Sequence, residues 1–222
     1  MPEVSVKIIS TSYVTHNVKR FTLEKPAGYN YVPGQGADMS IDAAGWRDKK
    51  RAFTFTSLNA WDRLELIVKI YRRHQGVTEQ LEKLQNGDSL IIGEPWGAIH
   101  YKGPGVFLSG GIGITPFVAI FRQLEQDRKL VGNMLIASYR SSRDVILDDE
   151  FNAMLAPEYF KVFTRENVVG FHDARLHEDE LVNMVQDFNR NFYLCGPDLF
   201  VSDLQKILTN LGVKSDVLIV ED

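Results

Sequence analysis

Cysteine is nearly absent from the sequence, with Cys195 as its single example in 222 residues. One cysteine cannot form a disulfide within the chain. It also supplies too few thiolates to hold an iron–sulfur cluster or a structural zinc ion. We therefore expect no metal site, and any redox chemistry must use another cofactor.

Long hydrophobic runs and a strong charge of one sign are also missing. No stretch of about 18 apolar residues could span a bilayer, and the first ten residues, MPEVSVKIIS, lack the basic and apolar segments of an export signal. The formal net charge is only −4, which gives no general reason to expect nucleic-acid binding. We expect a soluble, cytoplasmic protein that is a monomer and binds neither membranes nor nucleic acid.

Hydrophobic patterning divides the chain into two parts. From residue 4 to about residue 99, short β-rich runs are separated by Gly, Pro and Asn, with one helical stretch at 77–84. Evenly spaced short strands favour an antiparallel barrel or sandwich. After Gly103 apolar runs alternate with helical stretches, which is typical of a parallel sheet covered on both faces. The sequence thus predicts an antiparallel β domain, either a barrel or a sandwich, at 1–102, followed by an α/β parallel-sheet domain at 103–222.

The pattern also predicts where the elements lie. In the first part, strands are expected at 4–10, 18–24, 36–42, 51–57, 64–71 and 88–94. In the second part, strands are expected at 105–109, 133–139, 159–164, 191–196 and 216–220, alternating with helices at 116–127, 148–155, 178–185 and 199–211.

The motif GGIGITP follows the first strand of the second part. Gly110, Gly111 and Gly113 allow positive φ angles and a close approach of a ligand to the backbone. Thr115 suits the N-cap of the next helix and Pro116 its first position, so free amides and the helix dipole would favour a pyrophosphate there. The spacing differs from G-x-G-x-x-G, so a tight turn under a packed helix is the alternative interpretation.

Three further motifs each have a structural and a functional interpretation. CGP at 195–197 ends a strand of the second part, where ligands bind in open parallel sheets, although a lone cysteine on an apolar strand is often a core residue. RAFTFTS at 51–57 is a strand that begins with an arginine, and alternation puts its first, third and fifth residues on one face unless the strand ends early. GVT at 76–78 is either a helix cap or a second phosphate site.

Taken in order along the chain, these motifs resemble those of the ferredoxin–NADP reductase family. PGQ at 33–35 is similar to the segment before the family's third strand, RAFT to its R-x-[YF]-[ST] flavin motif, and GVT to its G-x-[ST] phosphate turn. GGIGITP resembles its nucleotide turn, FTRE at 163–166 its V-T-R-E segment, and CGP its Cys-Gly-Pro motif. The resemblance covers almost the whole chain. It implies a flavin-binding barrel followed by an NAD(P)-binding domain, without an iron–sulfur domain.

The resemblance also implies roles for individual residues. Arg51 would bind the flavin phosphate, Phe53 would lie against the ring or its ribityl chain, and Thr54 would hydrogen-bond the flavin near N5. Cys195 would lie beside the nicotinamide C4, and Thr54, Cys195 and Glu221 are the expected catalytic residues. The other expected flavin contacts are Ala52, Val68, Lys69, Ile70, Gly76, Val77 and Thr78. The expected nucleotide contacts are Gly110, Gly111, Gly113, Ile114, Thr115, Pro116, Arg140, Ser141, Arg143, Arg165, Cys195, Gly196 and Pro197.

FAD is expected rather than FMN, because Arg51 and the turn at Thr78 suit a pyrophosphate and the family mostly uses FAD. Trp96 either stacks on the adenine or is a buried core residue. NADPH is favoured over NADH, because the arginines of YRSSRD at 139–144 could surround a 2′-phosphate and no acidic residue stands at the strand end itself, although Asp144 is near. The alternative is that these arginines form an ordinary solvated loop.

The sequence departs from the family pattern at its end. Many family members end in an aromatic residue that covers the flavin, whereas this sequence ends DVLIVED. A more open flavin is therefore expected. Glu221 either helps proton delivery beside Cys195 or lies at the surface.

The principal hypothesis is a flavin-dependent NAD(P)H oxidoreductase that takes hydride from NADPH and passes single electrons to a flavodoxin- or ferredoxin-type carrier. The basic segments at 46–51 and 72–74 would attract such acidic carriers, unless they are only solvated loops. One alternative is a reductase of free flavin or another small acceptor. The other is a nucleotide-binding electron-transfer subunit without turnover of its own.

Overall fold

The computed structural model describes residues 3–97, 99–166 and 175–220. The chain divides into two compact units. The first unit consists of Met1–His100 together with Thr115–Gln123, and the second of Tyr101–Ile114 together with Leu124–Asp222. A short piece of the later chain therefore belongs to the first unit.

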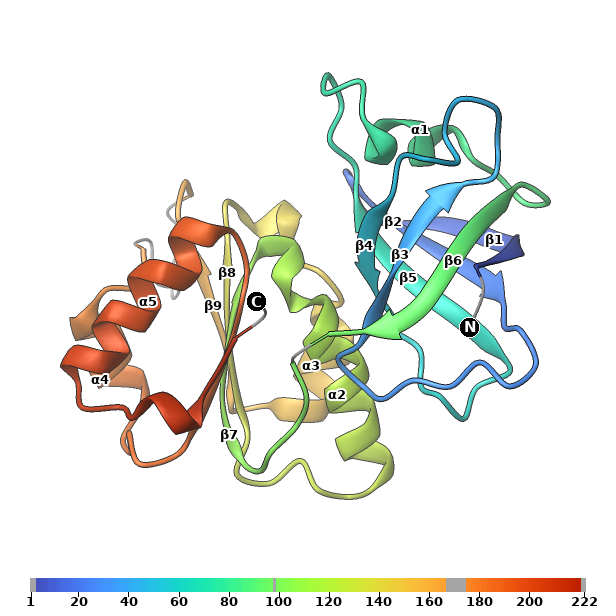
Figure 1. The fold of residues 1–222 in the computed structure, drawn as a ribbon. Coiled ribbons are helices and arrows are strands. Elements are labelled where there is room, and N and C mark those ends of the chain that lie inside the picture. The colour runs from blue at the N-terminus through green and yellow to red at the C-terminus, as the bar shows by residue number, and fades with distance from the viewer. Residues whose placement is uncertain (1–2, 98, 167–174, 221–222) are drawn as a thin grey trace. The chain divides into compact units, whose positions relative to one another are not determined.

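The first unit is built on a six-stranded antiparallel sheet in the order β4-β3-β6-β1-β2-β5. A bridge between Phe55 and Leu66 joins the two ends of this order and closes the sheet into a barrel, whose strands wrap around one another in Figure 1. The elements are β1 (Val4–Thr15), β2 (Val18–Glu24), β3 (Gly36–Ile41), β4 (Arg51–Thr54), β5 (Arg63–Lys69), α1 (Val77–Lys83) and β6 (Ser89–Trp96).

The barrel forms because alternate strand residues are apolar and point inward. Phe21, Met39, Phe55 and Leu64 are among the largest fully buried side chains of its core. Leu81 of α1 belongs to the same core, so the helix covers part of the barrel with its apolar face.

The second half of the chain alternates strands and helices. Its elements are β7 (Gly105–Gly110), the 3₁₀ turn η1 (Gly111–Ile114), α2 (Thr115–Gln126), β8 (Met134–Tyr139), η2 (Ser142–Asp144), α3 (Asp148–Leu155), β9 (Tyr159–Phe163), α4 (Glu178–Met184), β10 (Asn191–Cys195), α5 (Asp198–Asn210), η3 (Ser215–Val217) and β11 (Leu218–Val220). All strand pairs are parallel, in the order β11-β10-β7-β8-β9.

The parallel sheet has apolar side chains on both faces. On one face, Val106 of β7 and Leu194 of β10 pack with Leu181 of α4 and Leu204 of α5. Helix α3 lies on the opposite side of the sheet from α4 and α5 (Figure 1). Both faces are thus covered, which explains the nearly continuous apolar strands. The fold class expected from the sequence, an antiparallel barrel followed by an α/β parallel sheet, is confirmed.

Strand order places a switch point in the parallel sheet. The chain runs from β7 outward to β8 and β9, and then crosses to the other side of β7 to form β10 and β11. Adjacent strands β7 and β10 therefore send their connections in opposite directions, and ligands of open α/β sheets bind at this kind of position.

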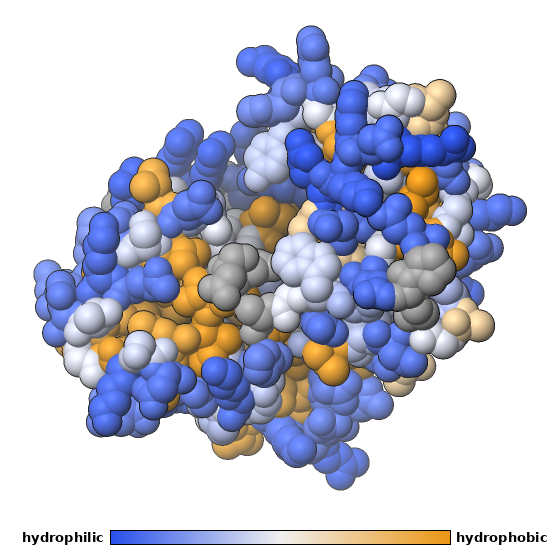
Figure 2. All heavy atoms as spheres, in the orientation of Figure 1, coloured by the Kyte–Doolittle hydropathy of each residue, from blue (hydrophilic) through white to orange (hydrophobic). Residues whose placement is uncertain are grey.

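Figure 2 shows the hydropathy of one face of the molecule. Hydrophilic side chains cover most of that view, and its largest hydrophobic area lies over α4 and α5. Among the described residues, no helix is long and apolar enough to cross a membrane.

Candidate functional site

The RAFT motif forms β4 at one end of the strand order. Arg51 and Ala52 are exposed, while Phe53 and Thr54 are half-buried, and Phe53 packs against the barrel core. Arg51 donates a hydrogen bond from Nη1 to the carbonyl of Lys50 at 2.7 Å. Its guanidinium is thus held at the surface, where it could reach a phosphate.

The strand ends earlier than its sequence suggests, so its alternation stops at Thr54. Phe55 and Thr56 are both fully buried, because the chain leaves β3 at this point. Phe55 bridges to β5, and the Thr56 hydroxyl donates to the Glu65 carboxylate at 2.7 Å.

The barrel has an open seam beside this motif. Beyond the Phe55–Leu66 bridge, no ladder joins β4 to β5 within the described residues. The β4 edge at Phe53–Thr54 and the β5 edge near Val68 face this seam, while the Ile70 amide donates to the carbonyl of Asn17 at 2.8 Å. Val68 and Ile70 are buried and Lys69 is half-buried. Such an edge can hydrogen-bond a flat polar ring, as the flavin interpretation requires.

The GVT turn begins α1, a few residues after β5. Gly76 is the N-cap, with an extended backbone and no side-chain cap, so Thr78 does not cap the helix. A Cβ on Gly76 would meet no atom nearer than the carbonyl oxygen of His74, at 3.8 Å. Val77 is buried and Thr78 half-buried. The turn is thus open enough to receive a phosphate.

A polar cluster fixes α1 on the barrel. The buried ammonium of Lys19 donates to the carbonyls of Glu82 and Leu84, at 2.9 and 2.6 Å, and so satisfies the carboxyl end of α1. The Glu82 carboxylate accepts hydrogen bonds from Tyr13 at 2.9 Å and from Nη2 of Arg72 at 2.5 Å. Both hydrogen bonds lower the pKa of Glu82, and the bond from Arg72 has the larger effect. Burial, followed by the Glu82 contact, raises the pKa of Tyr13.

Some of the cations in the basic segments are paired with neighbouring acids. Arg47 pairs with Asp42 at 2.7 Å, Lys50 pairs with Glu3, and Arg72 pairs with Glu82. Lys49 lies over the Trp46 ring, 4.0 Å from its centroid. The surface is therefore less cationic than its sequence suggests.

In the second unit, the glycine turn and the CGP motif are packed together at the switch point. Cys195 is the register partner of Ser109, the residue before the turn. A Cβ on Gly113 would lie 2.4 Å from the carbonyl oxygen of Cys195. A Cβ on Gly110 would lie 2.9 Å from Cδ of Pro197, and one on Gly196 would lie 3.0 Å from the amide nitrogen of Gly110. The structure thus brings the two motifs into one site.

Only one glycine of the turn needs its special backbone freedom. Gly111 has φ of 56° and no atom within 4 Å of a Cβ, whereas Gly110 and Gly113 are required by close packing. The predicted N-cap at Thr115 is wrong. The 3₁₀ turn η1, ending at Ile114, supplies the first turn, so Thr115 is the first residue of α2 and Pro116 the second.

Cys195 and Ser109 share a face at the carboxyl ends of their strands. Cys195 is only 7% exposed, so the structure supports burial of its thiol at the edge of the site. The Ser109 hydroxyl is buried and has no hydrogen-bond partner among the described residues.

The expected ribose-phosphate residues lie on two neighbouring loops. The amide of Arg165 donates to the carbonyl of Arg140 at 2.9 Å, which joins the loops after β9 and β8. Arg140, Arg143 and Arg165 are exposed. Acidic groups are present as well, because Ser141 donates to Asp144 at 2.6 Å and the Glu166 carboxylate accepts the Ser142 amide at 2.5 Å.

Two further sequence predictions concern Trp96 and Glu221. Trp96 is 42% exposed, so its interpretation as a buried core residue is wrong. Glu221 lies outside the described residues.

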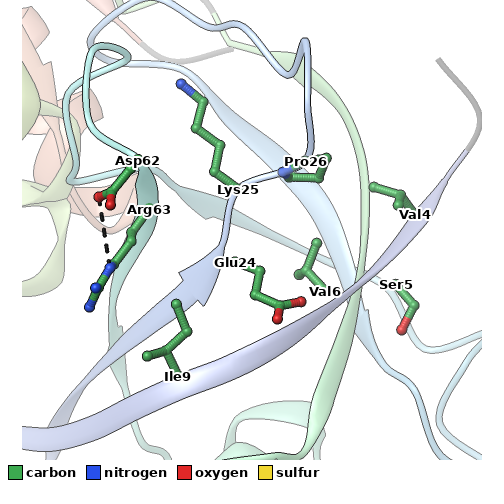
Figure 3. A pocket seen from close by; sticks show the side chains of 9 residues that line it. All are labelled: Val4, Ser5, Val6, Ile9, Glu24, Lys25, Pro26, Asp62 and Arg63. Atoms are coloured by element: carbon green, nitrogen blue, oxygen red, sulfur yellow. Dashed lines mark ion pairs between the residues drawn. The ribbon is translucent and has the colours of Figure 1, made fainter.

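A pocket of about 410 Å³ opens on the barrel, away from the motifs (Figure 3). It is lined by Val4, Ser5, Val6, Ile9, Glu24, Lys25, Pro26, Asp62 and Arg63. Arg63 begins β5 and Val68 lies near its end, so this pocket is at the opposite end of the strand from the open seam. None of the expected site residues lines it.

Sequence reasoning missed one buried charged pair. Arg122 of α2 donates from Nη1 to Oε1 of Glu65 at 2.7 Å, and the side chains are 11% and 13% exposed. The available signal was one charge inside an apolar run in each segment, LELIVK at 64–69 and TPFVAIFRQL at 115–124.

Comparison with known proteins agrees with this two-part geometry. Residues 5–101 match the family model described as the oxidoreductase FAD-binding domain. Residues 107–206 match the model described as the oxidoreductase NAD-binding domain. The chain belongs to the ferredoxin–NADP reductase family. It is therefore an NAD(P)H-dependent flavin oxidoreductase by family, with one domain for each cofactor.

Individual relatives differ in what their names say they act on. The chain is 24% identical to a nitrate reductase [NADH] of Cucurbita maxima over 98% of its own length. It is 27% identical to NADH-cytochrome b5 reductase 1 of Aspergillus terreus, over 90%. It spans 28% of the first relative's length and 74% of the second's.

A solved ferredoxin NADP⁺ reductase from Neisseria gonorrhoeae with bound FAD and NADP has the same fold. The TM-score is 0.83 at 20% identity, covering 99% of this chain and 98% of that one.

Proposed function

We propose that the protein takes a hydride from a reduced nicotinamide nucleotide onto FAD and passes the electrons singly to a protein acceptor. The observation that carries this is the packing of the glycine turn against CGP at the switch point of the parallel sheet, in a chain whose barrel has an open seam beside RAFT. When bound, the flavin supplies the conversion between two-electron and one-electron chemistry. The protein's own residues bind and orient.

The first unit fits a flavin. The exposed guanidinium of Arg51 and the uncapped turn from Gly76 to Thr78 would hold the phosphates. Phe53 offers a half-buried apolar ring, Thr54 a hydroxyl at the strand end, and Val68 a backbone edge that no ladder joins to β4. Two phosphate-binding features favour FAD over FMN.

The second unit fits a nicotinamide dinucleotide. Gly111 to Ile114 would present backbone amides to the pyrophosphate in the open space beside Gly111. Cys195, at the carboxyl end of β10, would lie beside the nicotinamide. We keep Glu221 as a proposed proton-handling group.

We propose NADPH as the donor, because Arg140, Arg143 and Arg165 are exposed on adjoining loops and can bind a 2′-phosphate. NADH is the alternative, since Asp144 and Glu166 stand in the same loops and both relatives carry NADH in their names.

Replacing Arg140 and Arg165 together by Ala tests this choice. If NADPH is the donor, kcat/KM for NADPH falls about tenfold or more while that for NADH stays the same, because only the 2′-phosphate loses its partners. Steady-state assays with both nucleotides measure this. Equal values for both nucleotides before and after the change would contradict the choice of NADPH.

For the acceptor, we propose a one-electron protein carrier of the flavodoxin, ferredoxin or cytochrome b5 class. The name of the Aspergillus relative favours cytochrome b5, and the ion pairs of Arg47, Lys50 and Arg72 weaken the electrostatic argument for flavodoxin or ferredoxin. Free flavin is the alternative acceptor, and a nucleotide-binding subunit without turnover is the alternative role.

The absorbance spectrum tests the proposal directly. The purified protein is expected to bind FAD with a yellow colour that NADPH or NADH bleaches without oxygen. Flavodoxin, ferredoxin, cytochrome b5 and free flavin are then compared as acceptors in stopped flow. A colourless protein that takes up no FAD would overturn the proposal.

A further inference from the structure

Helix α2 carries a buried arginine that the cofactor motifs do not use. Nη1 of Arg122 donates both to the carbonyl of Thr56 and to Oε1 of Glu65, each at 2.7 Å. The guanidinium also lies over the Trp61 ring, 5.3 Å from its centroid. Its side chain is only 11% exposed, so these contacts replace the water that a guanidinium would otherwise bind.

Its partner, Glu65, is the centre of a network in the barrel. The Glu65 carboxylate also accepts the Thr56 hydroxyl at 2.7 Å and faces Nε of Arg20 at 3.4 Å. The Glu65 amide donates to the Ser57 hydroxyl at 2.9 Å, and this hydroxyl is 2.7 Å from that of Tyr31. Arg122 is thereby tied to the barrel core through directional bonds.

The attachment of α2 to the barrel agrees with the way the chain divides into two compact units. Residues 115–123 belong to the compact unit formed by the barrel, although the glycine turn just before them belongs to the other. Ile120 supports the same attachment, since its Cδ1 would lie 3.3 Å from a Cβ on Gly34. The segment that follows the nucleotide turn is thus fixed on the barrel.

The attachment points adjoin the proposed flavin contacts. Glu65 precedes Val68 by three residues on β5, and Thr56 follows Thr54 by two. We propose that Arg122 is a positioning residue. Through Glu65 and Thr56 it holds residues 115–123 of α2 on the strands that carry the proposed flavin contacts, and so steadies the backbone that would orient the flavin.

This inference rests on the proposed function for its catalytic consequence, but the attachment itself does not. A charged pair suits the role because its hydrogen bonds define one geometry, whereas apolar contacts tolerate sliding. A small misplacement of reacting groups lowers a rate steeply.

Three variants test the proposal. Arg122→Met removes the charge and keeps the stem, and Arg20 still faces Glu65, so the barrel carboxylate remains paired. Arg122→Lys keeps the charge and loses the planar donor pair. The matched control, Lys129→Met, removes an exposed cation just after α2, whose side chain is 68% exposed.

Two readouts are compared in all three. Hydrogen exchange is measured on the protein without and with added flavin. The limiting rate of anaerobic flavin reduction and the nucleotide Kd come from stopped flow.

We expect Arg122→Met to speed exchange in residues 115–123 and to leave β8 unchanged. It should lower the limiting rate by roughly tenfold or more, with the Kd altered by less than about threefold and the flavin content unchanged. Arg122→Lys should restore part of the rate, and Lys129→Met should match the wild type in both readouts.

An unchanged limiting rate, a loss that only follows lost flavin, or an equal loss in Lys129→Met would overturn the positioning role. Unchanged exchange in residues 115–123 would overturn the attachment. A wild-type protein that is not reduced by either nucleotide would instead refute the proposed function, and the exchange data would still decide the attachment.

Discussion

Two glycines of the nucleotide turn are needed for different physical reasons. Gly111 has a left-handed backbone with open space around it, whereas Gly113 has an ordinary backbone pressed against the carbonyl of Cys195. From the sequence, both read as flexible glycines, because letters alone do not separate a φ requirement from a packing requirement.

Alanine at each position separates these reasons. Gly113→Ala should cost about 3 kcal/mol, because its Cβ would overlap the Cys195 oxygen. Gly111→Ala should cost about 1 kcal/mol, for the left-handed conformation alone. Thermal unfolding should therefore show Tm losses of roughly 6–12 °C and 2–4 °C. Equal losses would contradict the assignment.

At the scale of elements, regular strands and helices were predictable where side chains alternate or repeat with helical period. β2 and α3, for example, have the predicted bounds. The second half of β1 was missed because STSYVT lacks such a pattern, and its strand form depends on pairing with β2. The last strand was predicted to begin at residue 216, which is too early, because residues 215–217 form a 3₁₀ turn before β11.

Helix α1 depends on Glu82, whose pKa is lowered chiefly by the bond from Arg72. A carboxyl with a lowered folded-state pKa stabilises the fold above its unfolded pKa, and this contribution is lost as the pH falls through the folded value. Glu82→Gln should therefore lower the Tm near neutral pH, and the difference from wild type should vanish well below the ordinary glutamate pKa of 4.5.

Thermal unfolding between pH 7 and about pH 3 measures this difference. Glu125→Gln, at an exposed position on α2, is the control, and it should follow the wild-type curve. A Glu82→Gln difference that stays constant across the range would show that the side chain acts through packing rather than charge.

At the scale of the whole molecule, hydrophobic patterning was enough to predict two domains, and the order of six short motifs was enough to predict their cofactor classes. It could not predict the Arg122–Glu65 pair, which joins residues 57 positions apart. The sequence contains many acidic residues that could pair with Arg122, and only the folded barrel brings Glu65 next to it. The identity of the acceptor is equally beyond the motifs, because they describe cofactor binding and carry no information about the protein that collects the electrons.

The contribution of residues 115–123 to the barrel unit also bears on how such proteins can recombine. A crossover at the linker near residue 102 would join a barrel from one relative to an α2 helix from another, and so pair Glu65 with a foreign helix face. A functional chimera would have to inherit the first turns of α2 together with the barrel. The compact unit built on the barrel is therefore discontinuous along the chain, although the two family matches are consecutive.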